Sequence, residues 1–346
     1  MPGAATAGDE DLERAASAPS RLARASSASR QAAILARQGY GALFGRGTAF
    51  THQPLGRHID RDGLGGYYCD FRHKARAAAE HDDGFPRSSV TGQRAAWVIP
   101  VAQAALGYWE LRLDGEATEA RFVALADWLV ENAAPGPQGL CWYMEFARPK
   151  YALEPGWISA MGQGEAISVL LRAAALTGSE RYLATARAAL GPMTVEVEQG
   201  GVLRVLAGAP VLEEYPAARP CAVLNGWIFA LLGLHELVNV SGDERARDLF
   251  ARSAAGLVSL LPRYDVGWWS LYSLYDHGRP DLAKPFYQRL HPVLLEALDM
   301  VHPDPALRET ALRWESQVTT AALVRNSLNK LGFRAYRELA SRRGGR

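Results

Sequence analysis

Apolar residues recur at helical spacing along most of the chain, in stretches that come in pairs separated by a short turn signal. The pairs are Val98–Leu113 with Ala117–Asn132, Ile167–Leu176 with Glu180–Leu190, Trp227–Val238 with Glu244–Leu261, and Val293–Val301 with Pro305–Trp314. Gly115, Gly178 and Gly242 stand in the first three breaks, about 63 residues apart, and His302-Pro303-Asp304 forms the fourth. Because glycine and proline end helices, each unit predicts a helical hairpin.

Four hairpins at this period predict a mainly α fold, an (α/α) toroid or barrel with short β-hairpins in the connecting loops. An open solenoid is the alternative, but its repeats are shorter, at about 33 to 47 residues, and long varied loops fit it less well. The connections are rich in Tyr and Trp, and in a toroid the loops at one end would form the pocket. In one of them Thr194–Glu198 and Val202–Val205 alternate around Gly200-Gly201, which predicts a β-hairpin.

The chain before the first hairpin has a different character. Residues 1–20 are rich in Ala, Ser and Gly without an apolar period, so we interpret them as a disordered tail. Residues 21–88 begin with a helical stretch, Arg21–Tyr40, and continue with sequence that predicts irregular or short-strand structure from Thr48 to Arg87. Residues 89–342 form the predicted toroid domain.

Composition narrows the class of protein. The 346 residues include 38 Lys and Arg against 37 Asp and Glu, and this balance disfavours a nucleic-acid binder. Cys69, Cys141 and Cys221 are an odd number without a C-x-x-C pair, which fits a reducing compartment and argues against a disulfide framework or structural zinc. No apolar run reaches the roughly 18 residues of a membrane span, and no secretory signal is evident. We therefore expect no membrane span and a cytoplasmic location.

Candidate proton-transfer groups gather at Glu213-Glu214-Tyr215-Pro216, where carboxylates stand beside a phenol on a segment that leads into a helix. Asn225, at the head of that helix, is interpreted as its cap. We interpret the glycines at 162, 164 and 226 as positions of close backbone approach. They do not predict phosphate binding, because Gly162-x-Gly164 lacks the third glycine and the preceding strand of a dinucleotide fingerprint. No Gly-x-Ser-x-Gly motif supports a hydrolase triad.

Two sets of polar residues carry weaker signals. His52, His58, Asp60 and Asp62 have metal-ligand chemistry, but their spacing matches no standard site and we interpret them as a solvated loop. Arg72 and Lys74 are cations able to hold an anionic substrate, and Arg148 and Lys150 carry the same signal less clearly.

A series of segments in fixed order closely resembles the C-terminal catalytic region of the D-glucuronyl C5-epimerases. They are Trp157–Ser168, Glu213–Pro216, Val223–Leu234, Leu261–Gly267 and Trp269–Tyr272, with Gly66–Arg72 resembling an upstream Tyr-x-Asp-x-Arg element. The resemblance covers roughly residues 65–315. It implies an α/α-toroid isomerase that inverts carbon 5 of glucuronate to iduronate in a polysaccharide such as heparosan, the heparan sulfate precursor, without a redox cofactor. No residue pattern in this sequence matches a metal site, so we expect no metal.

The resemblance also implies roles for individual residues. Glu214 and Tyr215 would serve one face of the sugar ring, Tyr287 the opposite face, and Tyr272 would be a further essential phenol, while Glu213 would donate or cap. The residues implied to bind substrate are Tyr68, Arg72, Trp157, Gln163, Asn225, Trp269 and His291. Partners would be glucuronate-containing glycans, with a homodimer left open.

Two departures from the family pattern leave the exact uronate and polymer open. Tyr275 stands where the animal enzymes have Arg, and Gln288 replaces the His that follows the Tyr corresponding to Tyr287. The alternatives are a uronate polysaccharide lyase or a glycoside hydrolase on a similar toroid, and a non-catalytic glycan-binding helical protein. A hydrolase needs paired carboxylates across one bond, which adjacent Glu213 and Glu214 do not supply.

Overall fold

A computed structural model of the protein describes residues 53–87, 94–95 and 97–343, all within one compact unit, Thr51–Arg346. The predicted tail at 1–20 and the predicted helix Arg21–Tyr40 lie outside the described residues.

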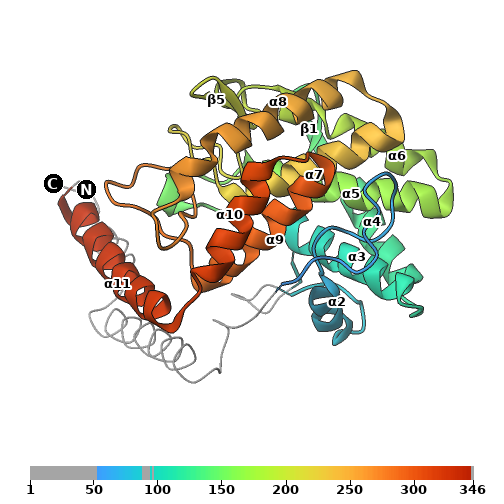
Figure 1. The fold of residues 1–346 in the computed structure, drawn as a ribbon. Coiled ribbons are helices and arrows are strands. Elements are labelled where there is room, and N and C mark those ends of the chain that lie inside the picture. Colours follow the sequence, from blue (N-terminus) through green and yellow to red (C-terminus); the bar gives the residue numbers. More distant parts are fainter. Residues whose placement is uncertain (1–52, 88–93, 96, 344–346) are drawn as a thin grey trace, which may run out of the picture. The chain divides into compact units, whose positions relative to one another are not determined.

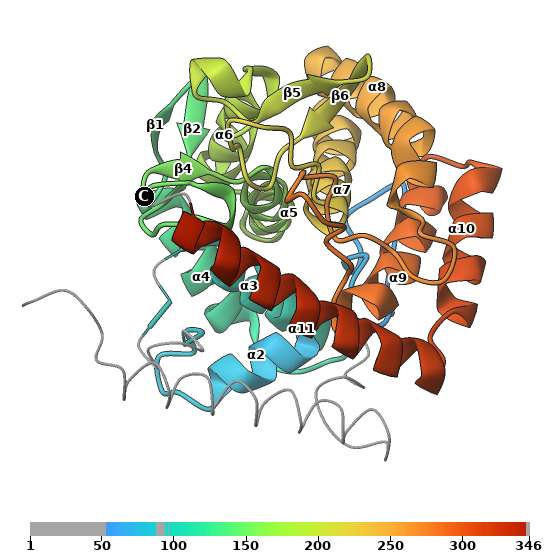
Figure 2. The same cartoon turned by 90° about the vertical axis from the view of Figure 1, so that its left-hand side faces the viewer.

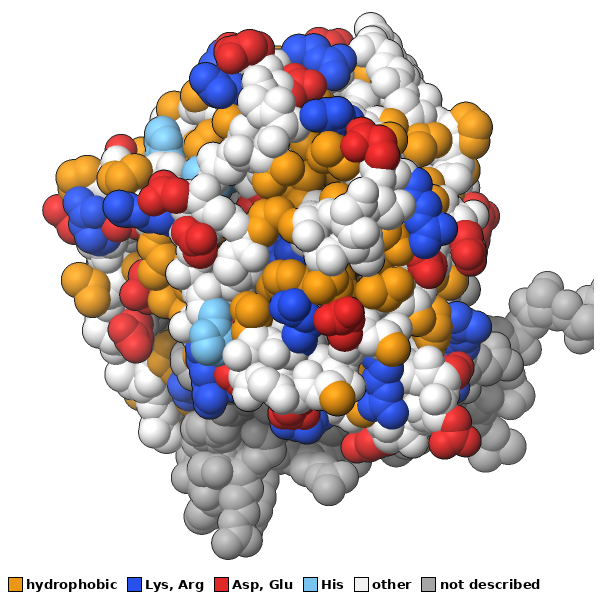
Figure 3. Space-filling view, turned by 90° about the vertical axis from the view of Figure 1, so that its right-hand side faces the viewer, with side chains coloured by type: hydrophobic (Ala, Val, Ile, Leu, Met, Phe, Trp, Pro, Cys, Tyr) orange, Lys and Arg blue, Asp and Glu red, His pale blue; other side chains and the backbone are white. Residues whose placement is uncertain are grey.

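Helices dominate the described residues and pair into four hairpins, as the apolar pattern predicts (Figure 1). The pairs are α3 (Val98–Leu113) with α4 (Glu119–Glu131), α5 (Ala160–Thr177) with α6 (Glu180–Ala188), α7 (Leu224–Ser241) with α8 (Glu244–Leu260), and α9 (Pro285–Val301) with α10 (Pro305–Ser316). The two helices of each pair pack against each other. Two further helices are α2 (Arg72–Ala79) and α11 (Thr320–Arg343). Figure 3 shows acidic and basic side chains interspersed over one face of the molecule.

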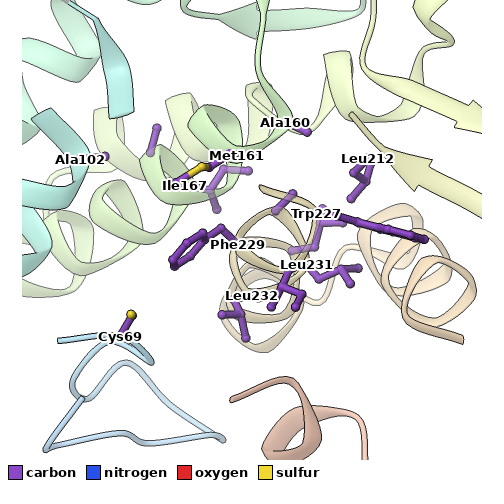
Figure 4. Close-up of a cluster of buried hydrophobic side chains, with 14 of the residues drawn as sticks. Cys69, Ala102, Ala160, Met161, Ile167, Leu212, Trp227, Phe229, Leu231 and Leu232 are labelled. Carbon is purple, nitrogen blue, oxygen red and sulfur yellow. The ribbon is translucent and has the colours of Figure 1, made fainter. Parts of the chain in front are cut away.

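The first helices of the hairpins pack side by side in chain order, α3 on α5, α5 on α7 and α7 on α9. Figure 2 shows α8 and α10 on the outer side of α7 and α9. Residues Leu224–Leu234 of α7 are buried on all sides, whereas its C-terminal end, with Val240, is exposed. Figure 4 shows Trp227 and Phe229 leaving α7 in opposite directions, and the Trp227 indole donates a hydrogen bond to Ser253 Oγ on α8 at 2.8 Å.

Glycine allows the closest of these contacts. A Cβ on Gly164 of α5 would stand 2.6 Å from the Ala230 Cα of α7, closer than carbon atoms can approach. A buried ion pair, Arg172 to Glu236 at 2.7 Å, joins the same two helices further along. The prediction that Gly164 permits close backbone approach is therefore confirmed.

Helix ends follow the predicted turn signals. Gly178 and Gly242 end α5 and α7 in the left-handed conformation, with φ of 69° and 64°, which glycine adopts without a Cβ clash. Asp243 then caps α8 by accepting hydrogen bonds from the Arg245 and Ala246 amides. The breaks between paired helices are confirmed.

Six short strands form three two-stranded antiparallel hairpins between the helices. They are β1 (Ala134–Gly136) with β2 (Gly139–Cys141), β3 (Tyr143–Met144) with β4 (Trp157–Ile158), and β5 (Leu203–Leu206) with β6 (Ala209–Leu212).

The hairpin predicted around Gly200-Gly201 was wrong in position. Val197–Gln199 is a 3-10 helix that Gly200 ends at φ 88°, and a Cβ on Gly201 would stand 2.1 Å from the Val195 carbonyl oxygen. The strands turn instead at Ala207-Gly208, where both residues have positive φ, the requirement of a tight type I′ turn.

Candidate active site

A cavity of about 230 Å³ opens where several connections meet the first helices. Five predicted site residues line it: Trp157, Glu214, Tyr215, Asn225 and Tyr287. Other polar residues on its wall are Gln53, Lys74, Gln103 and Arg148. Its apolar lining includes Phe146, Met161, Phe229 and Phe286. The cavity is thus a partly apolar pocket with a few convergent polar groups, as ligand sites commonly are.

Glu214 stands on the connection from β6 to α7 and packs on the first turn of that helix. A Cβ on Gly226 would lie 2.4 Å from Glu214 Oε2 and 2.6 Å from its Cβ, so only glycine leaves room for this carboxyl group. Burial raises the pKa of Glu214 from 4.5 to about 7, although the Tyr215 phenol, Arg148 and Lys150 oppose the rise. Oε2 has no hydrogen-bond partner among the described residues.

Tyr215 is held between two aromatic side chains. Its ring stacks on Tyr151 with centroids 4.5 Å apart and lies 5.4 Å from the Trp157 ring. Trp157 is fixed in turn, because its indole donates a hydrogen bond to the Phe146 carbonyl at 2.8 Å. Burial, together with the neighbouring Glu214, raises the pKa of Tyr215 well above its ordinary value, so the phenol stays protonated.

Glu213 points away from its neighbour and serves the backbone. Its carboxyl oxygens accept hydrogen bonds from the Cys221 amide at 2.9 Å and the Ala222 amide at 2.8 Å, and Arg204 lies 3.6 Å away. These bonds hold the turn that leads into α7. Glu213 therefore does not form a carboxylate pair with Glu214 in the cavity.

Two phenols approach from the next part of the chain. Tyr287, in the first turn of α9, lines the cavity, and its ring lies 4.7 Å from that of Tyr272. Burial raises the pKa of Tyr287 to about 12 and that of Tyr272 well above its ordinary value. Tyr272 does not line the cavity itself but stands behind Tyr287.

Asn225 is not the helix cap that the sequence suggests. Helix α7 begins one residue earlier, after Val223, so Asn225 lies within its first turn. Its side chain lines the cavity beside Met161, with Nδ2 4.0 Å from the Met161 sulfur. Its Oδ1 is buried and accepts no hydrogen bond from the described residues.

Arg148 supplies positive charge at the cavity wall. Its guanidinium lies 5.0 Å from the Phe146 ring centroid and 5.6 Å from that of Tyr215, and it forms no ion pair with a described carboxylate. Lys74 of α2 lines the same wall. The cavity therefore combines cations with the single carboxyl group of Glu214 on its lining.

Five predicted substrate-binding residues lie outside this cavity. Tyr68 is buried with its ring 5.8 Å from Tyr67, and its hydroxyl has no partner among the described residues. Arg72 pairs with Asp70 at 2.5 Å and Asp114 at 2.7 Å, and it lines a neighbouring cavity of about 560 Å³ that shares Lys74 with the first.

The other three serve the interior. Gln163 donates to the Leu140 and Ala189 carbonyls at 3.0 and 2.9 Å, and Trp269 donates to the Ala283 carbonyl at 2.8 Å. His291 is buried with Nδ1 2.9 Å from Ser270 Oγ, and burial lowers its pKa to about 3. These contacts stabilise the protein interior, and none of the three side chains lines the cavity of about 230 Å³.

Sequence reasoning missed the second buried carboxyl group near the cavity. Glu165 of α5 accepts a hydrogen bond from Gln103 at 3.0 Å, and burial raises its pKa well above the ordinary value. The signal was its position inside the segment Trp157–Ser168, one residue after Gly164. Gln53 and Gln103 carry no sequence signal of a site.

The predicted metal-capable loop behaves as a solvated loop where it is described. His58 Nε2 lies 2.9 Å from Asp114 Oδ1, and His52 lies outside the described residues. No group of three His, Cys, Asp or Glu side chains suited to a metal occurs in the part of the chain that the structure describes. Nor does any helix there have the length and apolar character to cross a membrane.

Comparison with known proteins identifies relatives. Residues 138–316 match the family model described as D-glucuronyl C5-epimerase C-terminus. A D-glucuronyl C5-epimerase of Caenorhabditis elegans is 35% identical over 209 residues, covering 56% of this chain and 34% of the relative. An uncharacterised protein of Methanocaldococcus jannaschii is 33% identical over 156 residues, covering 44% of this chain and 49% of the relative. The chain spans about a third of the first relative and about half of the second.

Proposed function

The chain belongs to the family of the D-glucuronyl C5-epimerase C-terminus, and from this premise we propose that it is an isomerase that inverts carbon 5 of glucuronate residues in a glycan. The observation that carries the proposal is the cavity in which Glu214, Tyr215 and Tyr287 meet beside Arg148.

The reaction needs both a base and a cation. The proton on carbon 5 is weakly acidic, because its removal leaves an enediolate with two negative charges. A cation or hydrogen-bond donors at the substrate carboxylate stabilise that charge as it develops. Arg148 has no carboxylate partner among the described residues, and we assign it to the substrate carboxylate, with Lys74 as the second cation of the cavity.

Glu214 is the base in this account. A carboxyl pKa of about 7 suits proton abstraction near neutral pH, because the group is half ionised and still basic. Glu214 takes the C5 proton, and the electron pair moves into the substrate carboxylate. The unpartnered Oε2 of Glu214 and Oδ1 of Asn225 are free to accept from substrate groups.

Tyr287 is the opposite partner. Its pKa of about 12 keeps the phenol protonated and able to give a proton to carbon 5 from the other face of the ring. The electron pair returns to carbon 5, so nothing is oxidised or reduced. Solvent then removes the proton from Glu214 and restores that of Tyr287. Tyr272, beside Tyr287, orients it.

We further infer that the four hairpins belong to an α/α toroid whose connections at one end form the cavity. The packing of α3, α5, α7 and α9 in chain order supports this arrangement. A cavity at the mouth of such a ring admits one sugar of a longer chain, so heparosan-type glycans are the first substrates to test.

Product analysis tests the proposal. The purified protein is incubated with uronate glycans at pH 7.5, and the products are analysed by NMR spectroscopy and by size. An epimerase gives iduronate signals in chains of unchanged length. Unsaturated products that absorb in the ultraviolet would replace the proposal with a lyase, and shortened saturated chains would replace it with a hydrolase.

A further inference from the structure

Helix α11 begins at Thr320, beyond residue 316, where the match to the family ends. It nevertheless contacts the segment that carries Tyr272 at several points. The Arg325 guanidinium lies 3.9 Å from the Trp268 ring, Asn326 donates to the Ala283 carbonyl at 3.1 Å, and the Phe333 ring lies 5.4 Å from that of His277. Figure 2 shows α11 crossing in front of α3.

A further contact of α11 is an ion pair with Asp281, which is buried. Its carboxylate binds Lys330 of α11 at 3.1 Å and Lys150, from the connection between β3 and β4, at 2.5 Å. Its backbone carbonyl accepts a hydrogen bond from the Tyr272 amide at 2.8 Å. Asp281 therefore joins α11 to both Lys150 and Tyr272.

Lys150 faces the site as well as Asp281. Its ammonium nitrogen lies 5.0 Å from the ring centroids of both Tyr151 and Tyr272, and it helps to lower the pKa of Glu214. The cluster of Lys150, Asp281 and Lys330 carries a net charge of +1, from two ammonium groups and one carboxylate. Without Lys330, Asp281 would cancel the charge of Lys150.

We propose that α11 is a positioning and charge-setting element of the site, in which Lys330 neutralises Asp281 so that the ammonium of Lys150 acts on Tyr272 and Glu214. This inference rests on the proposed function and deepens it, because it names Lys330 as a residue that sets the pH at which Glu214 acts as a base.

Other titratable groups also surround the cluster. Those that act on Glu214, or are acted on by it, are Tyr151, Arg148, Glu165, Glu213, Tyr215, Cys221, Tyr272 and Tyr287. Those near Asp281 and Lys330, apart from Lys150 of the cluster itself, are Tyr151, His277 and Lys284. None of them changes in the variants below, so the difference between variants isolates the charge removed.

The test is a titration of Glu214 that needs no substrate. The full chain is labelled with 13C at the glutamate carboxyl groups and titrated by NMR, with the Glu214 resonance assigned by its loss in Glu214→Gln. Lys330→Met removes a positive charge and raises the pKa of Glu214, whereas Asp281→Asn removes a negative charge and lowers it. Both shifts are expected to be a fraction of a pH unit, because neither Lys330 nor Asp281 is among the groups that act directly on Glu214.

Controls separate charge from packing. Lys330→Arg keeps the charge, and Leu328→Ala changes an exposed residue of the same helix, so both leave the titration unchanged. An unchanged titration in Lys330→Met, or shifts of equal sign in Lys330→Met and Asp281→Asn, would overturn the inference. If Asp281→Asn does not fold, the Lys330→Met and Lys330→Arg pair decides. Failure of the proposed function would appear separately, as absent product with these titration shifts intact.

Discussion

Replacement of Gly226 by Ala should disable the site while the protein still folds. The added methyl would stand 2.4 Å from Glu214 Oε2, 2.6 Å from its Cβ and 2.9 Å from its Cγ. Rotation of the carboxyl end relieves only the first of these contacts. The other two require Glu214 to shift bodily, together with the connection that carries it.

The cost in stability is moderate. Overpacking of this kind costs about 1–3 kcal/mol, and the higher helix propensity of Ala inside α7 returns about 1 kcal/mol. The net loss in the free energy of unfolding is therefore about 0–2 kcal/mol. A base displaced by about 1 Å from its reacting atom, however, costs on the order of 100-fold in rate.

Gly178→Ala is the matched control. It forces a left-handed residue with a Cβ, at a cost of about 1–2 kcal/mol, but a Cβ there meets no heavy atom within 4 Å and lies far along α5 from the cavity lining. Urea unfolding and the rate of epimerisation are measured for both variants. Equal rates in Gly226→Ala and Gly178→Ala would refute the reasoning that Gly226 seats Glu214.

Three further predictions concern charge. Burial raises the pKa of Glu214 from 4.5 to about 7, so the native state holds this proton more tightly than the unfolded chain does. Glu214 therefore lowers the free energy of unfolding progressively as the pH rises from about 4.5 to about 7, and by a constant amount above pH 7. Each tenfold change in proton affinity corresponds to about 1.4 kcal/mol, so Glu214→Gln should gain up to about 3 kcal/mol at pH 8 and little at pH 4.5 in urea unfolding; a loss of stability at pH 8 would contradict the assignment. The epimerisation rate should rise through an acidic limb near pH 7 and show no basic limb below about pH 10, because the Tyr287 phenol has a pKa of about 12; a fall between pH 8 and 9 would exclude Tyr287 as the donor. Arg148→Gln should lower kcat/KM roughly 10- to 150-fold, the equivalent of one hydrogen bond to a charged group. Arg148→Lys should retain part of the wild-type kcat/KM, and thermal unfolding should be unchanged in both variants. Wild-type activity in Arg148→Gln would remove Arg148 from the site.

The hairpins were predictable because their signal is local. Apolar spacing and glycine or proline breaks act within one or two turns, and the structure confirms a helical hairpin in all four pairs. Helix α2 was missed because its buried face is formed only by Ala75 and Ala78, which give almost no apolar period among Arg, His and Lys. The β5–β6 turn was missed because Gly200-Gly201 is the stronger local signal, while Ala207 adopts its positive φ under the constraint of the strands.

The site was only partly predictable for a related reason. Ordered motifs pointed to Glu214, Tyr215 and Tyr287, which the structure brings to one cavity. The same motifs contain residues such as Gln163 and Trp269, whose contacts are with the backbone of the interior. A motif does not distinguish a side chain that lines the cavity from one that supports it. The Lys150, Asp281 and Lys330 cluster joins residues 131 and 49 positions apart, a long-range contact that no local pattern encodes.

Deuterium exchange at carbon 5 shows whether Glu214 removes the proton from that carbon. A glucuronate glycan is incubated in deuterated water with the wild type and with Glu214→Gln, and the label is located by NMR spectroscopy. We expect deuterium at carbon 5 of intact chains with the wild type and none with Glu214→Gln. Exchange at carbon 5 that persists at the wild-type rate in Glu214→Gln would contradict it.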